Sequence, residues 1–282
     1  MKKRIMMVMV VAVLVVSALA LVACGGTATL SVKAVDAQIT ALTEVKSGTA
    51  DAAIIDSTMA GYLINKKDSD YKDLAMITVD GTNFEKEYYG VAAKKGKSKL
   101  MSFINNGIKT AQANGKYDEL LTKYGLASRK VAIDDEITVA EDWKSDLNDQ
   151  SKVVIGYTIN APMGIVDGKN VTGFDIDLAR AVFEGTGVTV VCKEINWDSK
   201  TADLNSGNID LVWNGLTINE DRLNTMEISV KYLMNEQAIV VKSANKDTIK
   251  AVADFAGKKV VVENGSAGQD AAAVIESVVN AK

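Results

Sequence analysis

The sequence lacks histidine altogether, and only two of its 282 residues are cysteines. Histidine is the commonest general base and the commonest metal ligand of proteins, so its absence removes both roles. A Ser-His-Asp or Cys-His catalytic set cannot be built from this chain. No paired-carboxylate motif takes its place, so we expect a protein that is not an enzyme and that uses no metal and no cofactor.

Basic residues are also too few for a nucleic-acid surface. The chain has 32 Lys and Arg against 36 Asp and Glu, with a formal net charge of -4. No run of Lys or Arg follows the first four residues, so nucleic acid is not an expected partner. With 48% hydrophobic and 24% charged residues, the composition is that of a globular protein with one large or two medium domains.

Residues 1–24 form a separate segment. Residues 2–4 are basic and residues 5–21 are almost wholly apolar, which is typical of a secretory signal peptide. The segment closes on Leu-Val-Ala-Cys24, which resembles a bacterial lipobox whose cysteine is lipidated; the alternative is a membrane anchor helix. Either way we expect the rest of the chain outside the cytoplasm, tethered to the cell membrane. A lipidated Cys24 leaves only Cys192, so no intrachain disulfide could form.

Helical and extended patterns alternate along the remaining chain. Residues 99–114 have the apolar spacing of an amphipathic helix, and residues 52–55 and 237–242 are continuous apolar strands. Such alternation predicts an α/β fold with largely parallel sheets flanked by helices. Residues 127–150 lose this periodicity and carry six acidic residues, which indicates a linker.

The stretch Asn208–Arg222 is the first candidate binding element. It predicts a short strand over 209–213, a turn containing Gly215, and then polar residues that end in Arg222. Ligands of open α/β sheets bind at the carboxyl ends of strands. There Thr217 offers a hydroxyl, and Arg222 a planar cation suited to a carboxylate. The alternative is a surface arginine that pairs with an adjacent acidic residue.

Two further elements that follow predicted strands are also candidate binding elements. Residues 263–268 join a strand to a helix through glycines, so free N–H groups at the helix start could hold an anion; the alternative is an ordinary capped turn. Asp56 follows a buried strand, and its alternative role is the N-cap of the next helix. An arginine and free N–H groups suit the carboxylate of an α-amino acid, and a carboxylate suits its ammonium group.

An internal similarity relates these elements. Residues 202–210 and 42–51 share a pattern in which a helix, a Ser-Gly stop and an aspartate precede an apolar strand. In this register Gly215 falls at the position of Asp56. Two α/β units built alike would therefore point their strand ends at one another from two lobes.

A family resemblance covers nearly all of the chain after the leader. The motifs are 153–156 through Ala161-Pro162, 173–179, 214–222, 257–260, 265–266, 47–56, 89–92 and 115–125. In combination they resemble the polar-amino-acid solute-binding proteins of ABC importers, the family 3 extracellular solute-binding proteins. The resemblance implies a two-lobed, type II periplasmic-binding-protein fold in which each lobe is a mostly parallel sheet flanked by helices.

The order of the motifs is exchanged relative to that family, as in a circular permutation. Lys282 would join onto about Thr29 in the usual order, which requires the two points to lie close together on the surface. The alternative is that the halves were joined by an assembly artefact. We expect lobe 1 to span 89–242, including the 127–150 linker, and lobe 2 to combine 27–88 with 243–282. Hinges are expected near 89–93 and 237–242.

The resemblance also implies roles for individual residues. Arg222, Thr217 and the Ser266 region would hold the α-carboxylate of the ligand, and the Gly215 carbonyl and Asp56 its α-ammonium group. Trp197 would pack on the ligand side chain. Asn160 stands where the family usually has a stacking aromatic residue, so the side-chain specificity is open.

The function expected from this resemblance is capture of a free amino acid between two lobes. A lipid-anchored monomer would deliver the amino acid to the membrane subunits of an ABC permease. Two alternatives remain: a ligand-sensing domain without a transport role, and an extracytoplasmic lyase on the same fold.

Overall fold

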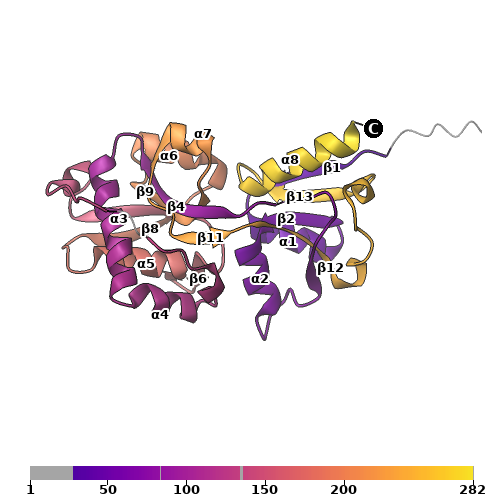
Figure 1. Cartoon of the computed structure of the whole chain (residues 1–282), viewed down its shortest axis with the longest axis horizontal. Helices are drawn as coiled ribbons and strands as arrows, with labels where there is room; N and C mark the ends of the chain where they lie inside the picture. The colour runs from indigo at the N-terminus through magenta and orange to yellow at the C-terminus, as the bar shows by residue number, and fades with distance from the viewer. Residues whose placement is uncertain (1–27, 83, 134–135, 282) are drawn as a thin grey trace, which may run out of the picture.

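The computed structural model describes residues 28–82, 84–133 and 136–281, which form two α/β lobes side by side (Figure 1). Each lobe has one main sheet and its own buried apolar clusters. Cys24 and the predicted signal segment lie outside the described residues. None of the described helices is long and apolar enough to cross a membrane.

Lobe 2 contains a five-stranded sheet in the order β1-β13-β2-β12-β3. Its strands are β1 (Ser31–Val35), β2 (Ala52–Asp56), β3 (Leu74–Ile77), β12 (Gln237–Lys242) and β13 (Lys259–Glu263). Its helices are α1 (Gln38–Ser47), α2 (Ser57–Asn65) and α8 (Ala267–Asn280), with 3-10 turns η4 (Ser243–Asn245) and η5 (Val252–Phe255). Every residue of β2 is buried, as its apolar run over residues 52–55 predicts for a central strand.

Lobe 1 contains a six-stranded sheet in the order β10-β4-β9-β5-β8, with β11 also paired to β4. Its strands are β4 (Glu87–Lys94), β5 (Lys152–Tyr157), β8 (Thr189–Glu194), β9 (Leu211–Thr217), β10 (Met226–Ile228) and β11 (Leu233–Asn235), beside a hairpin of β6 (Ile165–Asp167) and β7 (Asn170–Thr172). Its helices are α3 (Ser98–Ala113), α4 (Lys116–Lys123), α5 (Phe174–Phe183), α6 (Lys200–Ser206) and α7 (Glu220–Thr225), with 3-10 turns η1 (Ala127–Arg129), η2 (Trp143–Asp146) and η3 (Trp197–Ser199).

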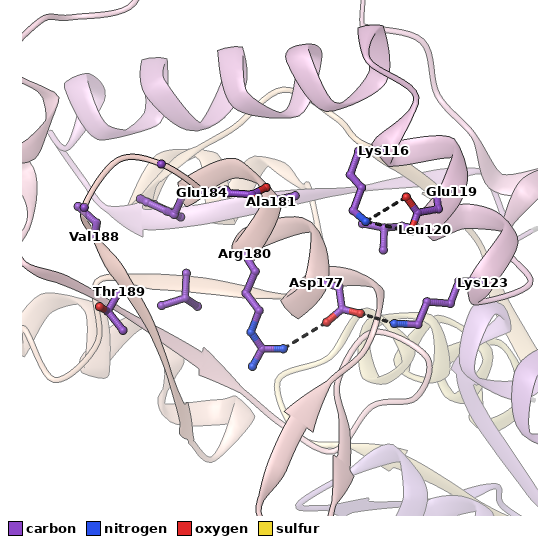
Figure 2. A pocket seen from close by; sticks show the side chains of 14 residues that line it. Lys116, Glu119, Leu120, Lys123, Asp177, Arg180, Ala181, Glu184, Val188 and Thr189 are labelled. Carbon is purple, nitrogen blue, oxygen red and sulfur yellow. Dashed lines mark hydrogen bonds and ion pairs between the residues drawn. The ribbon is translucent and has the colours of Figure 1, made fainter.

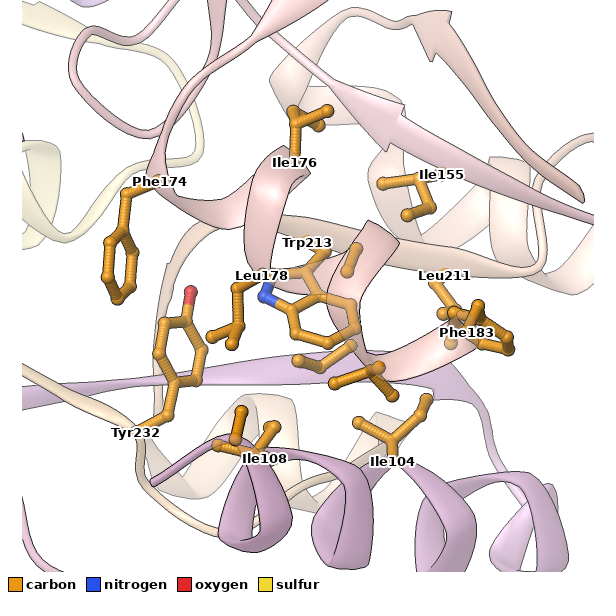
Figure 3. Packing of buried hydrophobic residues seen from close by; sticks show 14 of the residues in the cluster. Ile104, Ile108, Ile155, Phe174, Ile176, Leu178, Phe183, Leu211, Trp213 and Tyr232 are labelled. Carbon is orange, nitrogen blue, oxygen red and sulfur yellow. The ribbon is translucent and has the colours of Figure 1, made fainter. Parts of the chain in front are cut away.

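A large apolar core packs against β9, the strand that carries predicted site residues. Ile104 and Ile108 of α3 lie on one helical face, as their spacing predicts, and face Trp213 of β9 (Figure 3). The Tyr232 ring packs on Trp213, with ring centroids 6.3 Å apart. This core fixes the strand whose far end carries Gly215 and Thr217.

Three details of the predicted architecture are wrong. The sheets are mixed and not mostly parallel, because β4 and β12, the strands that follow the crossings between lobes, run antiparallel to their neighbours. The predicted lobe boundary at 242 is also wrong, since β12 pairs with β2 and β3 in lobe 2. Phe84 still packs on the lobe 2 core and Glu87 begins β4, so the chain crosses between the lobes at residues 85–86 and at Glu236, and not within the strands where hinges were expected.

The predicted turn at Gly215 is likewise wrong. Strand β9 continues to Thr217, because β4 pairs with it through Tyr89 opposite Thr217 and Gly90 opposite Leu216. Gly215 lies inside the strand with φ +66°, a left-handed conformation that glycine adopts without steric cost. Pairing with a strand more than a hundred residues away therefore overrides the local turn signal.

The 127–150 segment is anchored to lobe 1. The Trp143 ring of η2 stacks on Phe103 of α3 with centroids 3.8 Å apart and planes 9° from parallel. Asp146 also accepts a hydrogen bond of 2.9 Å from the Leu100 amide at the start of α3. This linker therefore covers the outer face of α3.

The start of β1 lies against the end of α8. The Leu30 amide donates to Asn280 Oδ1 at 2.8 Å, and Asn280 Nδ2 donates back to the Leu30 carbonyl at 3.2 Å. These two points were expected to be close together if the motif order is exchanged. The structure satisfies that condition.

Candidate functional site

The candidate site lies where strand ends from both lobes meet. Asp56 ends β2 and Glu263 ends β13 in lobe 2, while Thr217 ends β9 in lobe 1. Arg222 of α7 reaches across, with NH2 3.2 Å from the Gly265 carbonyl of lobe 2. All predicted binding side chains here are at least nine-tenths buried, so the lobes are closed on one another.

Asp56 is bound by side-chain amides from three directions. Its Oδ2 accepts from Gln38 Nε2 at 2.7 Å, and its Oδ1 accepts from Asn235 Nδ2 and Gln237 Nε2, both at 2.8 Å. Burial raises the pKa of Asp56, and the three amide hydrogen bonds oppose that rise. Its side chain does not cap α2, so the alternative role of Asp56 as an N-cap is wrong.

Arg222 is buried and directed at backbone carbonyls. NH1 donates to the Thr217 carbonyl at 2.6 Å, and NH2 donates to Gly265 of the other lobe. Asn219 caps α7 by accepting from the Arg222 amide at 2.9 Å, which fixes the start of the helix that carries the guanidinium. The alternative of an exposed arginine paired with a neighbouring acid is therefore wrong.

Ser266 is the N-cap of α8. Its Oγ accepts from the Gln269 amide at 3.1 Å and donates to the Glu263 carbonyl at 2.7 Å. The capped-turn alternative is thus present in the structure, but the same turn also supplies the Gly265 carbonyl that Arg222 contacts. The start of α8 consequently faces the arginine.

Gly215 and Asn160 face each other in lobe 1. A Cβ on Gly215 would lie 3.3 Å from Asn160 Nδ2 and 3.3 Å from the Tyr89 ring, and the Gly215 amide donates to Asp175 Oδ2 at 2.6 Å. Asn160 Oδ1 is buried and has no hydrogen-bond partner among the residues that the structure describes. An unpaired buried acceptor of this kind can receive an N–H from a bound ligand.

Trp197 packs within lobe 1, next to the interface with lobe 2. It is buried in a cluster with Val212, Leu216 and Met226. Its carbonyl accepts a hydrogen bond of 3.0 Å from Lys200 Nζ. Packing of this ring on a ligand side chain stays a prediction.

Sequence reasoning missed a second carboxylate that shares the hydrogen-bond donors of Asp56. Glu87, the first residue of β4, accepts from the side-chain amides of both Asn235 and Gln237, the latter at 2.6 Å. Burial and then the charge of Asp56 raise the pKa of Glu87 to about 7. No local signal marks Glu87, because it lies in a polar Glu-Lys-Glu run.

Lys200 was also missed, and Glu263 was predicted only as the first residue of the 263–268 turn. Burial, followed by the repulsion of Arg222, lowers the pKa of Lys200 to about 8. Burial, followed by the charge of Asp56, raises the pKa of Glu263 to about 8. With Asp56, Glu87 and Arg222, they place five ionisable groups in the interface.

Two cavities flank this charged centre. One of about 380 Å³ is lined by Glu87, Thr217 and Gln237 and by apolar residues of α8. Another, of about 460 Å³, lies between residues 36–39 of lobe 2 and residues 158–159 and 194–196 of lobe 1. Both have contributions from each lobe, as a site between lobes requires.

A larger hollow of about 660 Å³ lies elsewhere, over α4 and α5 of lobe 1 (Figure 2). Five of its charged side chains are paired with one another. Asp177 accepts from Lys123 at 2.7 Å and from Arg180 at 3.2 Å, and Lys116 pairs with Glu119 at 2.9 Å. It contains none of the predicted site residues, so we assign no site there.

Residues 153–278 match the model of the bacterial extracellular solute-binding proteins, family 3. Over these residues, which are less than half of the chain, the sequence is similar to that family. The matched segment contains Arg222, Thr217, Gly215, Asn160 and Trp197, together with the start of α8. The predicted family and two-lobed α/β class are confirmed; the exchanged order of the halves stays a prediction.

Curated relatives match over part of their length. The L-cystine-binding protein TcyJ of Escherichia coli K12 is 37% identical over 100 residues, which cover 36% of this chain and 37% of that protein. The arginine-binding extracellular protein ArtP of Bacillus subtilis is 30% identical over 119 residues, 42% of this chain and 46% of that protein. A probable histidine-binding protein of Campylobacter jejuni is 27% identical, covering 41% and 45%. The chain thus matches less than half of each relative, and all three are binding proteins and not enzymes.

Solved structures give partial matches of the same kind. A substrate-binding protein of an ABC uptake transporter from Streptococcus pneumoniae, crystallised with histidine, is 40% identical, covering 30% of this chain and 35% of that chain with a TM-score of 0.28. An ancestral arginine-binding protein bound to glutamine is 30% identical, covering 46% and 58% with a TM-score of 0.38.

Proposed function

We propose that this protein binds a free amino acid between its two lobes. The observation that carries the proposal is the opposed placement of Asp56 from lobe 2 and Arg222 from lobe 1, both buried at one interface. A carboxylate and a guanidinium held apart by the fold suit the α-ammonium and the α-carboxylate of a zwitterion.

Unused acceptors around this pair support an ammonium site. Asn160 Oδ1 and Gln237 Oε1 are buried without partners in the described part of the chain. A primary ammonium group has three N–H donors and no acceptor, so it could satisfy such oxygens together with Asp56. Leaving buried acceptors unpaired costs free energy, which ligand binding would recover.

Transport is the role that the family suggests for such a site. In this proposal the protein is exported, lipidated at Cys24 and held at the outer face of the cell membrane, where it delivers its amino acid to ABC permease subunits. The lobes would open and close about residues 85–86 and Glu236, where the chain crosses between them.

The exchanged motif order is a second part of the proposal. We infer a circular permutation of the usual family order, supported by the paired hydrogen bonds between Leu30 and Asn280. A short connection between these points would restore the usual order without moving either lobe.

Isothermal calorimetry against the common amino acids and L-cystine tests the binding proposal. The protein without its leader should give saturable heat with at least one of them, and thermal unfolding should shift upward with the same ligand. No heat and no shift with any of them would contradict the proposal. Chemical change of a bound amino acid after long incubation would instead indicate an enzyme.

A further inference from the structure

Lys200 is a buried lysine in the interface between the lobes. It begins α6, is 6% exposed, and extends its Nζ to two backbone carbonyls, Trp197 at 3.0 Å and Gly265 at 3.1 Å. Its Nζ also lies 5.0 Å from the centroid of the Trp197 ring. The Trp197 carbonyl belongs to its own lobe, whereas the Gly265 carbonyl belongs to the other.

The Gly265 carbonyl is shared by two cations. Arg222 NH2 donates to the same oxygen at 3.2 Å, so both side chains of lobe 1 converge on one neutral acceptor of lobe 2. Within the part of the chain that the structure describes, no carboxylate forms an ion pair with either cation.

The acidic groups around these cations act only at longer range. Lys200 is influenced by Asp198, Glu263 and Asp270, and Arg222 by Asp270, Asp56, Glu87 and Glu263. Burial first, and the like charge of Arg222 second, lower the pKa of Lys200 to about 8. A neutral carbonyl offsets this repulsion only partly, whereas an anion would remove it.

We propose that Lys200 is a second carboxylate-binding residue, which takes the ligand carboxylate jointly with Arg222 in place of the Gly265 carbonyl. This proposal rests on the proposed amino-acid site. Arg222 NH1 already donates to the Thr217 carbonyl, which leaves NH2 for one oxygen of the ligand carboxylate. Lys200 would give the other carboxylate oxygen its own charged donor. The site consequently selects for a free α-carboxylate over a neutral α-amide.

The experiment compares an amino acid with its α-amide in two proteins. L-arginine and L-histidine are titrated by calorimetry, each beside its α-carboxamide, into wild type and Lys200→Met, which keeps the apolar stem and removes the charge. Lys200→Met should bind the free amino acid about 10- to 100-fold more weakly, as expected for loss of a charged hydrogen bond. The amide should lose much less, so the preference for the acid over the amide should narrow.

A pH series separates charge from packing. Wild-type affinity for the free amino acid should fall above a pH of about 8, where Lys200 loses its proton, while the wild-type to Lys200→Met affinity ratio approaches one. Lys200→Arg should restore part of the affinity at pH 9. Lys193→Met, at an exposed lysine of β8, is the matched control and should bind as wild type does.

The outcomes distinguish the two proposals. If wild type binds neither these nor any other common amino acid, the proposed function fails. If wild type binds and Arg222→Ala does not, but Lys200→Met keeps wild-type affinity or loses acid and amide equally, only the role of Lys200 is overturned. Thermal unfolding of each ligand-free variant shows whether it is folded before these results are compared.

Discussion

Asp56 and Glu87, which come from different lobes, accept hydrogen bonds from the same two side-chain amides. Asn235 Nδ2 and Gln237 Nε2 each donate to Asp56 Oδ1 and to Glu87 Oε1. Asn235 and Gln237 flank Glu236, where the chain crosses from one lobe to the other, so the pair of carboxylates lies beside a crossing point. A buried and a half-buried acid this close resist being ionised together.

Replacing Glu87 by glutamine should make folding stability less dependent on pH. The folded-state pKa of Glu87, about 7, is raised above its ordinary value of 4.5, so its stabilising contribution is complete below about pH 4.5 and is lost as pH rises through 7. Wild-type stability should therefore fall between pH 5 and 8, and Glu87→Gln should remove on the order of 1 to 2 kcal/mol of that fall. Urea unfolding at several pH values measures this.

The interpretation fails if Glu87→Gln and wild type show parallel stability curves over that range. Glu85→Gln, at an exposed carboxylate just before β4, is the control and should leave the dependence of stability on pH unchanged.

Removing the Trp143 ring should destabilise lobe 1. Trp143 stacks on Phe103 and also packs against Phe183 at 5.9 Å between centroids, so its loss opens a cavity over α3. Trp143→Ala should lower the free energy of unfolding by about 3 kcal/mol, the range seen for buried aromatic truncations. Trp143→Phe should recover more than half of the loss. Equal stability of Trp143→Ala and wild type would show that the linker does not hold α3.

A relinked chain tests the exchanged order. Asn280 would be joined to Leu30 by a short Gly/Ser linker, and the chain opened at the exposed turn between Glu141 and Asp142. Because the joined points already share two hydrogen bonds, we expect this protein to fold and to bind the same ligand within about threefold, a change of less than 1 kcal/mol. Circular dichroism and calorimetry provide the readouts. Failure to fold would contradict the inferred permutation.

Sequence patterns identified the elements that carry the site, but not the contacts between them. Asp56, Thr217 and Arg222 could be proposed because each follows a strand, and the ends of strands in α/β sheets are where ligands bind. Their partners could not be predicted in this way. Asn235 and Gln237 reach Asp56 across 179 and 181 positions of sequence, a separation at which no local periodicity carries information.

The burial of Lys200 could likewise not be predicted from the local sequence. A lysine on the first turn of a helix is usually exposed, whereas Lys200 is buried and donates to the Gly265 carbonyl of the other lobe. The continuation of β9 through Gly215 likewise depends on β4, which pairs with it from the preceding half of the chain. Local residue preferences thus predicted the elements, while pairing across the chain set the strand ends, the lobe boundary and the charged centre.

The central claim is that Asp56 and Arg222 together bind a free amino acid. Calorimetric titration of the tightest-binding amino acid into wild type, Asp56→Asn and Arg222→Ala tests it most directly, with thermal unfolding to confirm that each variant is folded. We predict that each substitution weakens binding by at least about 100-fold, since each removes one charged partner of the zwitterion. Wild-type affinity in either folded variant would contradict the account.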